Sequence, residues 1–445
     1  MKKIFSLYLS VPLVWRILTG FLLGIALGIF ASRTQREALN VVLTYVEPFG
    51  TLLISMLKAI VFPIIFFSLI IGAASLSLKK SGKLGGSVLL WYFVTSIVAA
   101  LFGIVTAFIL NPKMSGAIET AASHRGELEV LRDLPSAGGL DAFLVSLFQN
   151  PFQALAEGRF LAIVVFSILF GLAARVLLES SKTSERDKAR IESFLDFCRA
   201  ASAISFKLID WLMEYFPFGV FALSFVNFAR NGVLLFGPYL RIVACVIACV
   251  SGMIFLVYPL ALFVFCRRNP YKILLALRAP ILTAFATRSS AAALPVSLRT
   301  AEKLGVSPSL SSFSLPLGCT INMDGVCVHL PVFVILASNI FGIPLTATQM
   351  AILLVSVVFA SVGAGGVPGG SVFLLFMVLE NAGFNPAQTA TIVALALGIN
   401  PILDMFETAC NVTGDNVCTY IVAKQNGLLE DSSPEKALEN DARPE

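Results

Sequence analysis

The sequence has few charged residues. Lys, Arg, Asp and Glu together make up 13% of the 445 residues, whereas hydrophobic residues make up 57%. From Ile242 to Phe265 there is no charge at all. At about 1.5 Å rise per residue, a helix of this length covers a hydrocarbon layer of roughly 30 Å. The composition therefore excludes an ordinary soluble protein and predicts an integral membrane protein.

Histidine is nearly absent, and cysteine is absent from the longest polar loop. The two histidines are His124 in that loop and His329 in an apolar segment, which we interpret as a hydrogen-bonded interior residue. All eight cysteines fall in or beside apolar segments, which argues against a disulfide framework. The sequence contains no zinc-finger spacing, Ser/His/Asp arrangement, phosphate-binding loop or basic patch interleaved with aromatics. We therefore predict neither an enzyme nor a nucleic-acid-binding protein.

Long apolar segments dominate the chain. They run approximately over residues 12–32, 41–76, 86–111, 159–178, 203–229 and 234–266, and the region 273–424 is apolar with short polar interruptions. Lys and Arg gather in alternate loops, and such loops stay on the cytoplasmic side. We therefore expect a cytoplasmic N-terminus and an outward loop at about 112–158. The first apolar segment has no small-residue cleavage pattern, so we interpret it as a retained span rather than a signal peptide.

Clusters of Gly, Ser, Asn and Pro interrupt the apolar stretches after about residue 270. Backbone that leaves helical hydrogen bonding at membrane depth must be buried in protein or line a cavity, so each interruption is a candidate site. We predict a re-entrant hairpin tip at 288–295, a broken helix at 318–325, a second tip at 361–371 and a second polar interruption at 411–415. A hairpin followed by a polar-broken helix, twice, is typical of inverted repeats around a midplane site.

The last span carries a polar stripe. Its members recur at helical spacing, so they share one face: Asn400, Asp404, Glu407, Thr408, Asn411 and Asp415. Carboxylates in lipid are costly, and the only deep cation is Arg288, so the stripe is expected to face cations, water or donors. The alternative is that Asp324, Asp404 and Asp415 are salt-bridged residues that maintain the fold, or that one lies at a helix end in water.

These residue types suit a particular chemistry. Asn, Thr and Asp side chains, with carbonyls of unwound helix, supply the oxygen ligands that hard monovalent cations prefer. Helix N-termini at two hairpin tips would face an anionic group such as a substrate carboxylate. The residues alone therefore predict a cation-coupled transporter of a small anionic or zwitterionic solute.

Three motifs resemble the signatures of the dicarboxylate/amino acid:cation symporters, the family of glutamate/aspartate and neutral amino-acid transporters. They are Asn322-Met-Asp-Gly325, Gly365-Gly-Val-Pro-Gly369 and Asn411-Val-Thr-Gly-Asp415. The resemblance extends over the whole chain and implies an all-α polytopic membrane protein, a homotrimer with eight transmembrane helices and two re-entrant helical hairpins. It also implies an elevator motion of a transport domain against a trimerisation scaffold.

The resemblance divides the chain as follows. Residues 1–80 form scaffold spans 1–2, residues 81–111 span 3 of the transport domain, and residues 112–230 the outward loop with scaffold spans 4–5. Residues 231–424 form the rest of the transport domain, with span 6, the first hairpin, span 7, the second hairpin and span 8. Residues 425–445 are a solvated cytoplasmic tail, and the chain is expected in the plasma (inner) membrane with both termini cytoplasmic.

The resemblance implies sodium as the coupling ion and places three sodium sites on this chain. One uses Asn322, Asn411 and Asp415 with the backbone of Gly318. A second uses Tyr92, Thr95 and Ser96 with Asn322 and Asp324. A third consists mostly of carbonyls, from Thr320 and from the second hairpin around Ser361 and Ala364. All of the family's acidic sodium ligands are present, and the one departure is Asn400, where many relatives have Asp.

The resemblance also implies a substrate site. Asp404 stands where the family holds the substrate α-amino group, and Thr408 and Asn411 where it holds the α-carboxylate. The hairpin tips contribute Arg288, Ser289 and Ser290 on one side and Val367 and Gly370 on the other. At the two positions that favour an acidic side chain in relatives, this chain has Glu407 in place of Arg and Val326 in place of Thr. Because two buried carboxylates repel each other, a glutamate or aspartate substrate is disfavoured.

Glu407 admits three accounts: it pairs with Arg288, it is protonated and donates a hydrogen bond, or it attracts a basic side chain. We favour pairing or protonation, and hence a sodium symporter of a small neutral amino acid. The alternatives are an acidic amino-acid or dicarboxylate symporter and a basic-substrate variant, either of them with or without proton coupling. A channel, or a sensor that binds amino acid without moving it, belongs to a different class, and the retained sodium ligands argue against it.

Overall fold

The computed structural model describes residues 11–33, 36–74, 82–112, 145, 147–157, 159–363 and 370–430. These residues form helices, with an isolated antiparallel bridge between Val306 and Leu429. Six of their helices are long and apolar enough to cross a membrane, and shorter apolar helices include Trp15–Ala31, Phe62–Ala74 and Ala347–Val362. The prediction of an all-α protein with many apolar helices is confirmed. Most of the outward loop with His124, the second hairpin tip and the tail after Glu430 lie outside the described residues.

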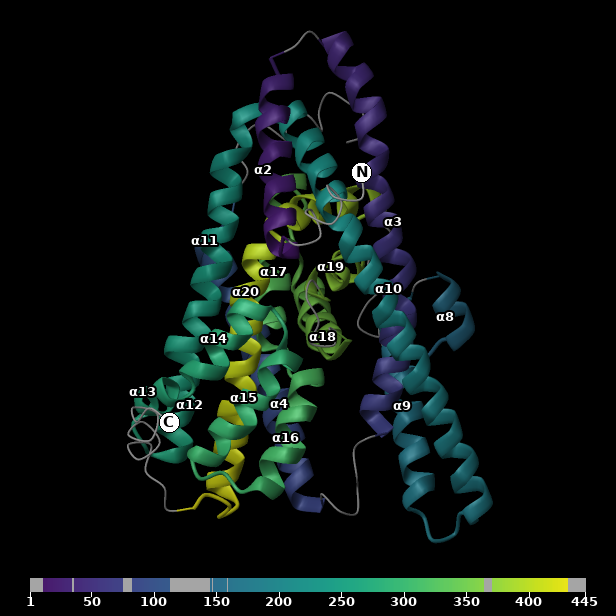
Figure 1. Cartoon of the computed structure of the whole chain (residues 1–445), viewed down its shortest axis with the longest axis vertical. Helices are drawn as coiled ribbons and strands as arrows, with labels where there is room; N and C mark the ends of the chain where they lie inside the picture. The colour runs from purple at the N-terminus through teal and green to yellow at the C-terminus, as the bar shows by residue number, and fades with distance from the viewer. Residues whose placement is uncertain are drawn as a thin grey trace.

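Four long helices pack together in the right-hand and upper parts of Figure 1. They are α2 (Leu13–Ala31), α3 (Arg36–Ala74), α9 (Phe160–Glu179) and α10 (Glu185–Asn231), with the short α8 (Pro151–Glu157) against α9. Pro63 and Pro217 lie inside α3 and α10. These four helices are the segments that we assigned to the scaffold.

Glycines at a spacing of four let α2 approach α10 closely. A Cβ atom at Gly24 would lie 2.6 Å from the Phe221 carbonyl oxygen, and one at Gly28 would lie 2.7 Å from that of Phe225. Small residues at this spacing are the usual means by which membrane helices pack backbone against backbone. Both glycines are buried, and the ion pair of Arg16 on α2 with Glu214 on α10 joins the same two helices.

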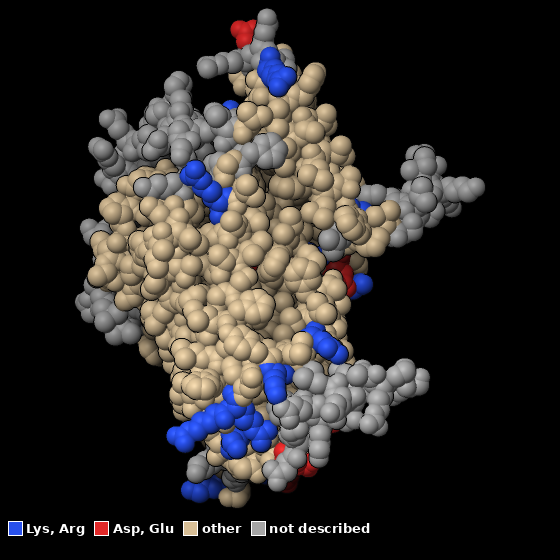
Figure 2. Space-filling view, turned by 90° about the vertical axis from the view of Figure 1, so that its left-hand side faces the viewer, with Lys and Arg blue, Asp and Glu red and all other residues tan. Residues whose placement is uncertain are grey.

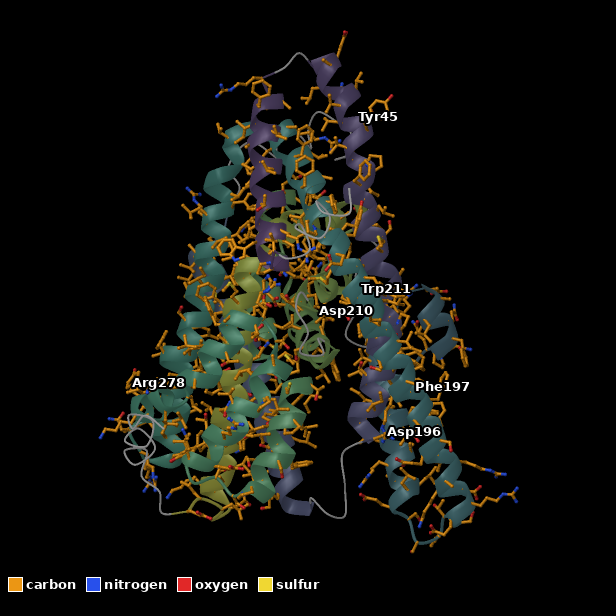
Figure 3. The ribbon with its side chains drawn as sticks, viewed as in Figure 1. Tyr45, Asp196, Phe197, Asp210, Trp211 and Arg278 are labelled. Atoms are coloured by element: carbon orange, nitrogen blue, oxygen red, sulfur yellow. The ribbon has the colours of Figure 1, made fainter. Side chains whose placement is uncertain are left out.

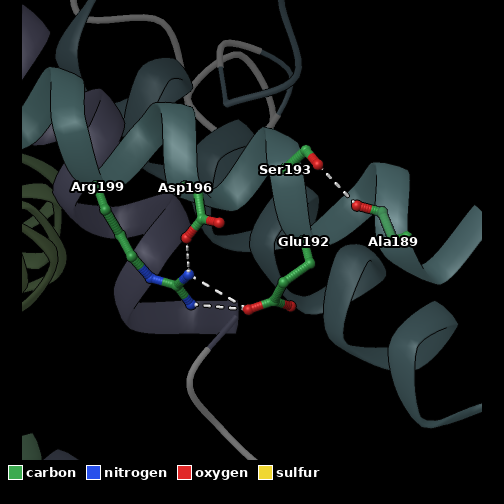
Figure 4. Close-up of polar contacts among 5 residues, drawn as sticks. All are labelled: Ala189, Glu192, Ser193, Asp196 and Arg199. Atoms are coloured by element: carbon green, nitrogen blue, oxygen red, sulfur yellow. Dashed lines mark hydrogen bonds and ion pairs between the residues drawn. The ribbon is translucent and has the colours of Figure 1, made fainter.

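The first half of α10 is polar and carries its own counter-charges. Ser184 caps the helix by accepting a hydrogen bond from the Asp187 backbone amide at 3.1 Å. Further along, Arg199 contacts both Asp196 and Glu192 on the same helix (Figure 4). Exposed apolar side chains lie among these charges and further along α10, and Phe197 and Trp211 are two of them (Figure 3).

The remaining helices surround a long central helix. They are α4 (Gly82–Leu110), η1 (Gly232–Leu235), α11 (Phe236–Gly252), a π-helical turn (Met253–Val257), α12 (Tyr258–Cys266), α13 (Pro270–Ala276), α14 (Arg278–Thr287), α15 (Ser290–Lys303), α16 (Pro308–Ile321), α17 (Asp324–Phe341), α18 (Ala347–Gly363), α19 (Gly370–Asn381) and α20 (Pro386–Gln425). Most of them contact α20, which lies at the centre of this side in Figure 1. The largest apolar core of the described residues lies here, and α17 is buried along nearly its whole length.

Two of the predicted interruptions are confirmed. Helices α14 and α15 pack on each other and are joined at Arg288, which adopts a left-handed conformation with φ of 54°, and Ser289. Helices α16 and α17 are separated only by Asn322 and Met323. At the second hairpin, α18 and α19 contact each other, and the tip between them lies outside the described residues.

The fourth predicted interruption is wrong, because α20 runs unbroken through residues 411–415. Within the helix, Thr408 and Thr413 each donate a hydrogen bond to the carbonyl oxygen four residues earlier, Asp404 and Ala409 respectively. The polar residues therefore satisfy helical geometry instead of breaking it. This motif presents side chains from a regular helix, whereas the motif at Asn322 opens the backbone itself.

Charge is concentrated at one end of the molecule. On the face drawn in Figure 2, most of the Lys and Arg side chains gather toward the lower end, and the surface above them is largely uncharged. Figure 3 places Arg278 at the same end, beside α13. Exposed large apolar residues such as Phe255, Leu260 and Phe263 lie along the π-helical turn and α12. An apolar band that ends in basic residues is typical of a protein embedded in a bilayer.

Candidate functional site

The break between α16 and α17 is joined to α20 by a buried amide and a buried carboxylate. The side-chain nitrogen of Asn322 donates a hydrogen bond to Oδ1 of Asp415 at 3.0 Å. On its other side Asn322 accepts a hydrogen bond from the hydroxyl of Thr95 on α4 at 3.3 Å. All three side chains are buried. The structure therefore brings together residues from three helices that the sequence assigned to sodium sites.

Asp324 begins α17 and is fully buried. Its two carboxylate oxygens accept hydrogen bonds from different helices: Oδ1 from Ser96 on α4 at 3.3 Å, and Oδ2 from Tyr258 on α12 at 2.8 Å. A carboxylate at the first position of a helix also interacts favourably with the helix dipole. These contacts fix Asp324 in place, and within the described part of the chain it forms no ion pair.

A tyrosine and a glycine complete this cluster. The hydroxyl of Tyr92 donates a hydrogen bond to the carbonyl oxygen of Ser314 on α16 at 2.8 Å. A Cβ atom at Gly318 would lie 2.6 Å from Oδ1 of Asp415 and 2.7 Å from the Tyr92 hydroxyl. Only glycine allows both oxygens to approach the α16 backbone this closely. The prediction that Gly318 contributes backbone beside Asp415 therefore has a steric basis in the structure.

Asn411 lies between the cluster around Asn322 and Asp324 and the polar residues around Asp404. Its side-chain oxygen accepts a hydrogen bond from the backbone amide of Gly325 at 2.7 Å. This amide lies at the start of α17, where helix N–H groups have no partner within the helix. Asn411 thereby satisfies the end of a broken helix from the face of an unbroken one.

Three predicted ligands of the third sodium site differ in their placement. Ser361 is buried near the end of α18, and its hydroxyl donates a hydrogen bond to the Val358 carbonyl oxygen of the same helix at 2.8 Å. The side chain of Thr320 is exposed and bonds to the carbonyls of Pro316 and Leu317 on its own helix, so it takes no part. Ala364 lies outside the described residues.

The second group of predicted residues lies around Asp404. Nη1 of Arg288 lies 3.7 Å from Oδ2 of Asp404, and both side chains are buried. Next to Arg288, Ser289 caps α15 by accepting a hydrogen bond from the Ala292 amide at 3.3 Å. Ser290 is buried at the first position of α15. The first hairpin tip thus lies against the polar stripe of α20, as the sequence predicted.

Glu407 does not contact the residue that we expected. Its carboxylate oxygen Oε1 lies against Nδ1 of His329 on α17, whereas the ion pair of Arg288 is formed with Asp404. Both His329 and Glu407 are 1% exposed. The account in which Glu407 pairs with Arg288 is therefore wrong about the partner, although it is right that Glu407 has one.

The other predicted substrate residues are mostly buried nearby. Val326 is buried near the start of α17, and Thr408 is buried on α20 with its hydroxyl on the Asp404 carbonyl at 2.7 Å. Val367 lies outside the described residues, and Gly370 begins α19. Every described member of the α20 stripe is buried, including Asn400.

The sequence reasoning missed two residues of these clusters. Tyr258 was read only as part of a charge-free span, although a tyrosine in such a span needs a hydrogen-bond partner when buried. His329 was assigned an interior role without a partner. Its position three residues after Val326, and so on the same face of an apolar helix as a predicted substrate residue, was the signal that pointed to this site.

The electrostatics of the two clusters differ. Around Asp404 and Glu407, the structure provides Arg288 and His329 as basic partners. Among the described residues, Asp324 and Asp415 take part in no ion pair and are held by hydroxyl and amide donors instead. Two buried carboxylates beside amide, hydroxyl and carbonyl oxygens fit hard monovalent cations as ligands. The neighbouring group consists of Arg288, Asp404 and the N-terminus of α15. It offers charges of both signs, as the recognition of a zwitterion requires.

Comparison with known proteins assigns this architecture. Residues 13–425 match the sodium:dicarboxylate symporter family, and the chain belongs to that family of transporters. Among its relatives is the serine/threonine transporter SstT of Bifidobacterium adolescentis, 30% identical over 417 residues, which cover 93% of this chain and 90% of the relative. The proton/sodium-glutamate symport protein of Geobacillus stearothermophilus is 30% identical over 421 residues, 94% of this chain and 95% of the relative. That of Bacillus caldotenax is 29% identical over 432 residues, 96% and 98% respectively.

Proposed function

We propose that this protein is a secondary active symporter that couples sodium entry to the uptake of a small neutral amino acid. The observation that carries the sodium part is the pair of buried carboxylates, Asp324 and Asp415, which lie beside oxygen donors and outside any described ion pair. Buried charges of this kind are stabilised by bound cations. Membership of the sodium:dicarboxylate symporter family supports the same assignment.

The proposed sodium ligands are those assigned from the sequence, and Thr320 contributes its backbone carbonyl, as assigned there. Asn322, Asn411 and Asp415 form one site with Gly318, and Tyr92, Thr95, Ser96 and Asp324 form a second with Asn322. Ser361 and Ala364 contribute to a third. Hydrogen bonds that already connect these side chains leave oxygen atoms concentrated at one place, which suits a dehydrated monovalent ion.

The proposed substrate site consists of Arg288, Ser289, Ser290, Val326, Val367, Gly370, Asp404, Glu407, Thr408 and Asn411. Asp404 would accept hydrogen bonds from the substrate α-amino group, and the start of α15 would receive the α-carboxylate. Glu407 and Val326 offer no positive charge or hydroxyl to a second carboxylate. A neutral side chain is therefore favoured over that of glutamate, in keeping with the name of the serine/threonine relative.

The alternative substrate is an acidic amino acid, since two relatives of similar identity are named glutamate symporters. Purified protein in liposomes separates the two. With an inward sodium gradient we expect serine and alanine to accumulate and aspartate to lag behind. Accumulation of aspartate at the rate of serine would contradict the neutral assignment, and exchange without accumulation would contradict sodium symport.

We further propose eight transmembrane helices with two re-entrant hairpins, assembled as a homotrimer in the plasma (inner) membrane with both termini cytoplasmic. Helices α2, α3, α9 and α10 would form the scaffold, and α4 with α11–α20 the domain that moves as an elevator. The close packing within each set supports this division. The mass of the detergent-solubilised protein tests the trimer, and cysteine accessibility before and after sodium addition tests the motion.

A further inference from the structure

Two carboxylates on neighbouring turns of α20 have different basic partners. Asp404 is held by Arg288 of the first hairpin tip at 3.7 Å, and Glu407 is in contact with Nδ1 of His329 on α17. Asp404 and Glu407 are three residues apart, so they lie on the same face of the helix. If Asp404 receives the substrate α-amino group, the His329–Glu407 pair lies one turn away, at the distance of a short side chain.

The surroundings of the pair are apolar. His329 is 1% exposed, and its ring lies 4.8 Å from that of Phe333, centroid to centroid, with the planes tilted by 59°. Val326 occupies the position one turn before His329 and is also buried. A polar pair in such surroundings costs free energy that a well-packed apolar pair of the same size would not. A role in maintaining the fold is therefore a weak explanation for it.

The pair also leaves hydrogen-bonding capacity unused within the protein. Nε2 of His329 is buried and has no hydrogen-bond partner among the described residues. The same holds for the Ser290 hydroxyl and for Nε of Arg288, which both belong to the first hairpin tip. Buried polar atoms are normally satisfied. Arg288 and His329 both lie against the polar stripe of α20, so the unsatisfied atoms of these side chains indicate a ligand at that stripe that provides their partners.

We propose that His329, together with Glu407, forms the subsite for the substrate side chain and selects a side chain with a hydroxyl group. This inference rests on the proposed function and names the substrate class of that site. A hydroxyl both donates and accepts, so it can satisfy a carboxylate oxygen and an imidazole nitrogen together. A methyl group satisfies neither atom, and a carboxylate would only accept and would face Glu407.

The magnitude of the selection follows from the cost of leaving the pair unsatisfied. A site built to hydrogen-bond a substrate hydroxyl rejects the analogue that lacks it far more strongly than an apolar pocket rejects an extra group. Serine and alanine differ only by this hydroxyl. We expect the wild-type protein to transport serine with a kcat/KM roughly tenfold or more above that of alanine.

The test compares two substitutions on α17, one turn apart. His329→Leu replaces the imidazole by an apolar side chain of similar size. Phe333→Leu makes a neighbouring side chain smaller but leaves it apolar, and this side chain packs on the same imidazole. In liposomes with an inward sodium gradient, we expect His329→Leu to bring the serine/alanine ratio of kcat/KM close to one, mainly through a lower value for serine. Phe333→Leu should leave the ratio at its wild-type value.

The outcomes separate this inference from the function on which it rests. If no amino acid is accumulated in a sodium-dependent way, the proposed function fails. If serine and alanine are accumulated and the ratio is near one in the wild-type protein, or is unchanged in His329→Leu, the assignment of His329 is wrong and sodium symport stands. Faster uptake of ornithine than of serine would likewise overturn it, in favour of a basic side chain.

A second variant tests the proposal if the first one does not fold. Should His329→Leu fail to give a cooperative thermal transition, Glu407→Leu removes the other half of the pair. The proposal then requires that Glu407→Leu lower the serine/alanine ratio of kcat/KM to about one. Sodium-dependent binding of serine and alanine to the detergent-solubilised protein gives a second readout that does not depend on transport. Retention of the serine preference in Glu407→Leu would overturn the proposal.

Discussion

The side-chain amide of Asn322 donates a hydrogen bond to Asp415 across 3.0 Å, and this contact joins a helix break to an unbroken helix. Asn322 lies where α16 and α17 separate, and Asp415 lies in the C-terminal half of α20. The break exposes backbone groups, and the continuous helix presents side chains at fixed intervals. A cation site that combines both can be preorganised by the rigid helix while the break supplies carbonyl oxygens.

Replacement of Asp415 should weaken sodium binding. Asp415→Asn keeps the size and an oxygen that can accept the Asn322 hydrogen bond but removes the negative charge. We expect the sodium concentration for half-maximal uptake to rise about tenfold or more, since a nearby unit charge in a buried site contributes more than the free energy of a tenfold change. A sodium titration of uptake in liposomes measures it. Asn416→Ala is the control, because Asn416 is buried next in sequence but bonds to Ser297 of α15. An unshifted titration for Asp415→Asn would refute the role.

Replacement of Tyr258 by Phe should have a smaller effect on the same titration. The hydroxyl of Tyr258 is one of the two donors that hold Asp324, at 2.8 Å. Without it, one carboxylate oxygen loses a hydrogen bond worth about 1.5–3 kcal/mol when the acceptor is charged. Asp324 would then be less well oriented, and we expect a fewfold rise in the sodium requirement with little change in the substrate KM at saturating sodium. An equal change in both constants would indicate a general loss of structure instead.

A positive charge at position 407 should admit acidic substrates. In Glu407→Arg, the guanidinium would replace the carboxylate that repels a substrate side-chain carboxylate and could pair with it in two hydrogen bonds. We expect sodium-driven aspartate uptake to arise and serine uptake to fall. Glu407→Gln, which removes the charge without supplying a new one, is the matched control and should give little aspartate uptake. Unchanged aspartate binding in Glu407→Arg would contradict the placement of this residue in the pocket.

The close approach of α2 and α10 predicts a difference between two identical substitutions. A Cβ atom at Gly28 would lie 2.7 Å from the Phe225 carbonyl oxygen, whereas one at Gly237 on α11 would meet no atom within 4 Å. Gly28→Ala should destabilise the protein by about 1–3 kcal/mol through overpacking. Gly237→Ala should leave stability unchanged or slightly raised, because alanine favours the helix. Thermal unfolding in detergent compares them, and equal transitions would exclude the contact.

Much of the fold followed from apolar length and from the placement of polar clusters. The absence of charge between Ile242 and Phe265 was enough to predict a spanning segment, which corresponds to α11, the π-helical turn and α12. The hairpin tip at Arg288 and the break at Asn322 were predictable because Ser, Asn and Gly clusters have no packing reason to interrupt an apolar run. These signals depend on local sequence, which is why they were correct.

The errors concern groups whose behaviour depends on tertiary partners. The motif at 411–415 has the same composition as a break, and only its hydroxyls, bonded back to carbonyls of the same helix, keep α20 regular. The partner of Glu407 was likewise not readable, because Arg288 and His329 come from different elements that converge on one face of α20. Sequence gives the stripe, and three-dimensional packing decides which basic residue meets which acid.

The π-helical turn at Met253–Val257 sets the orientation of α12 relative to α11. A π turn holds one more residue than an α turn and so rotates everything after it by about 100° relative to everything before it. Tyr258 directly follows this turn and reaches Asp324, and Phe265 further along stacks edge-on against Trp91 of α4. Deletion of a single residue within the turn would straighten the span and turn both aromatic rings away from their partners together. The two contacts therefore depend on the same turn, and a change of its length by one residue should disturb both of them at once.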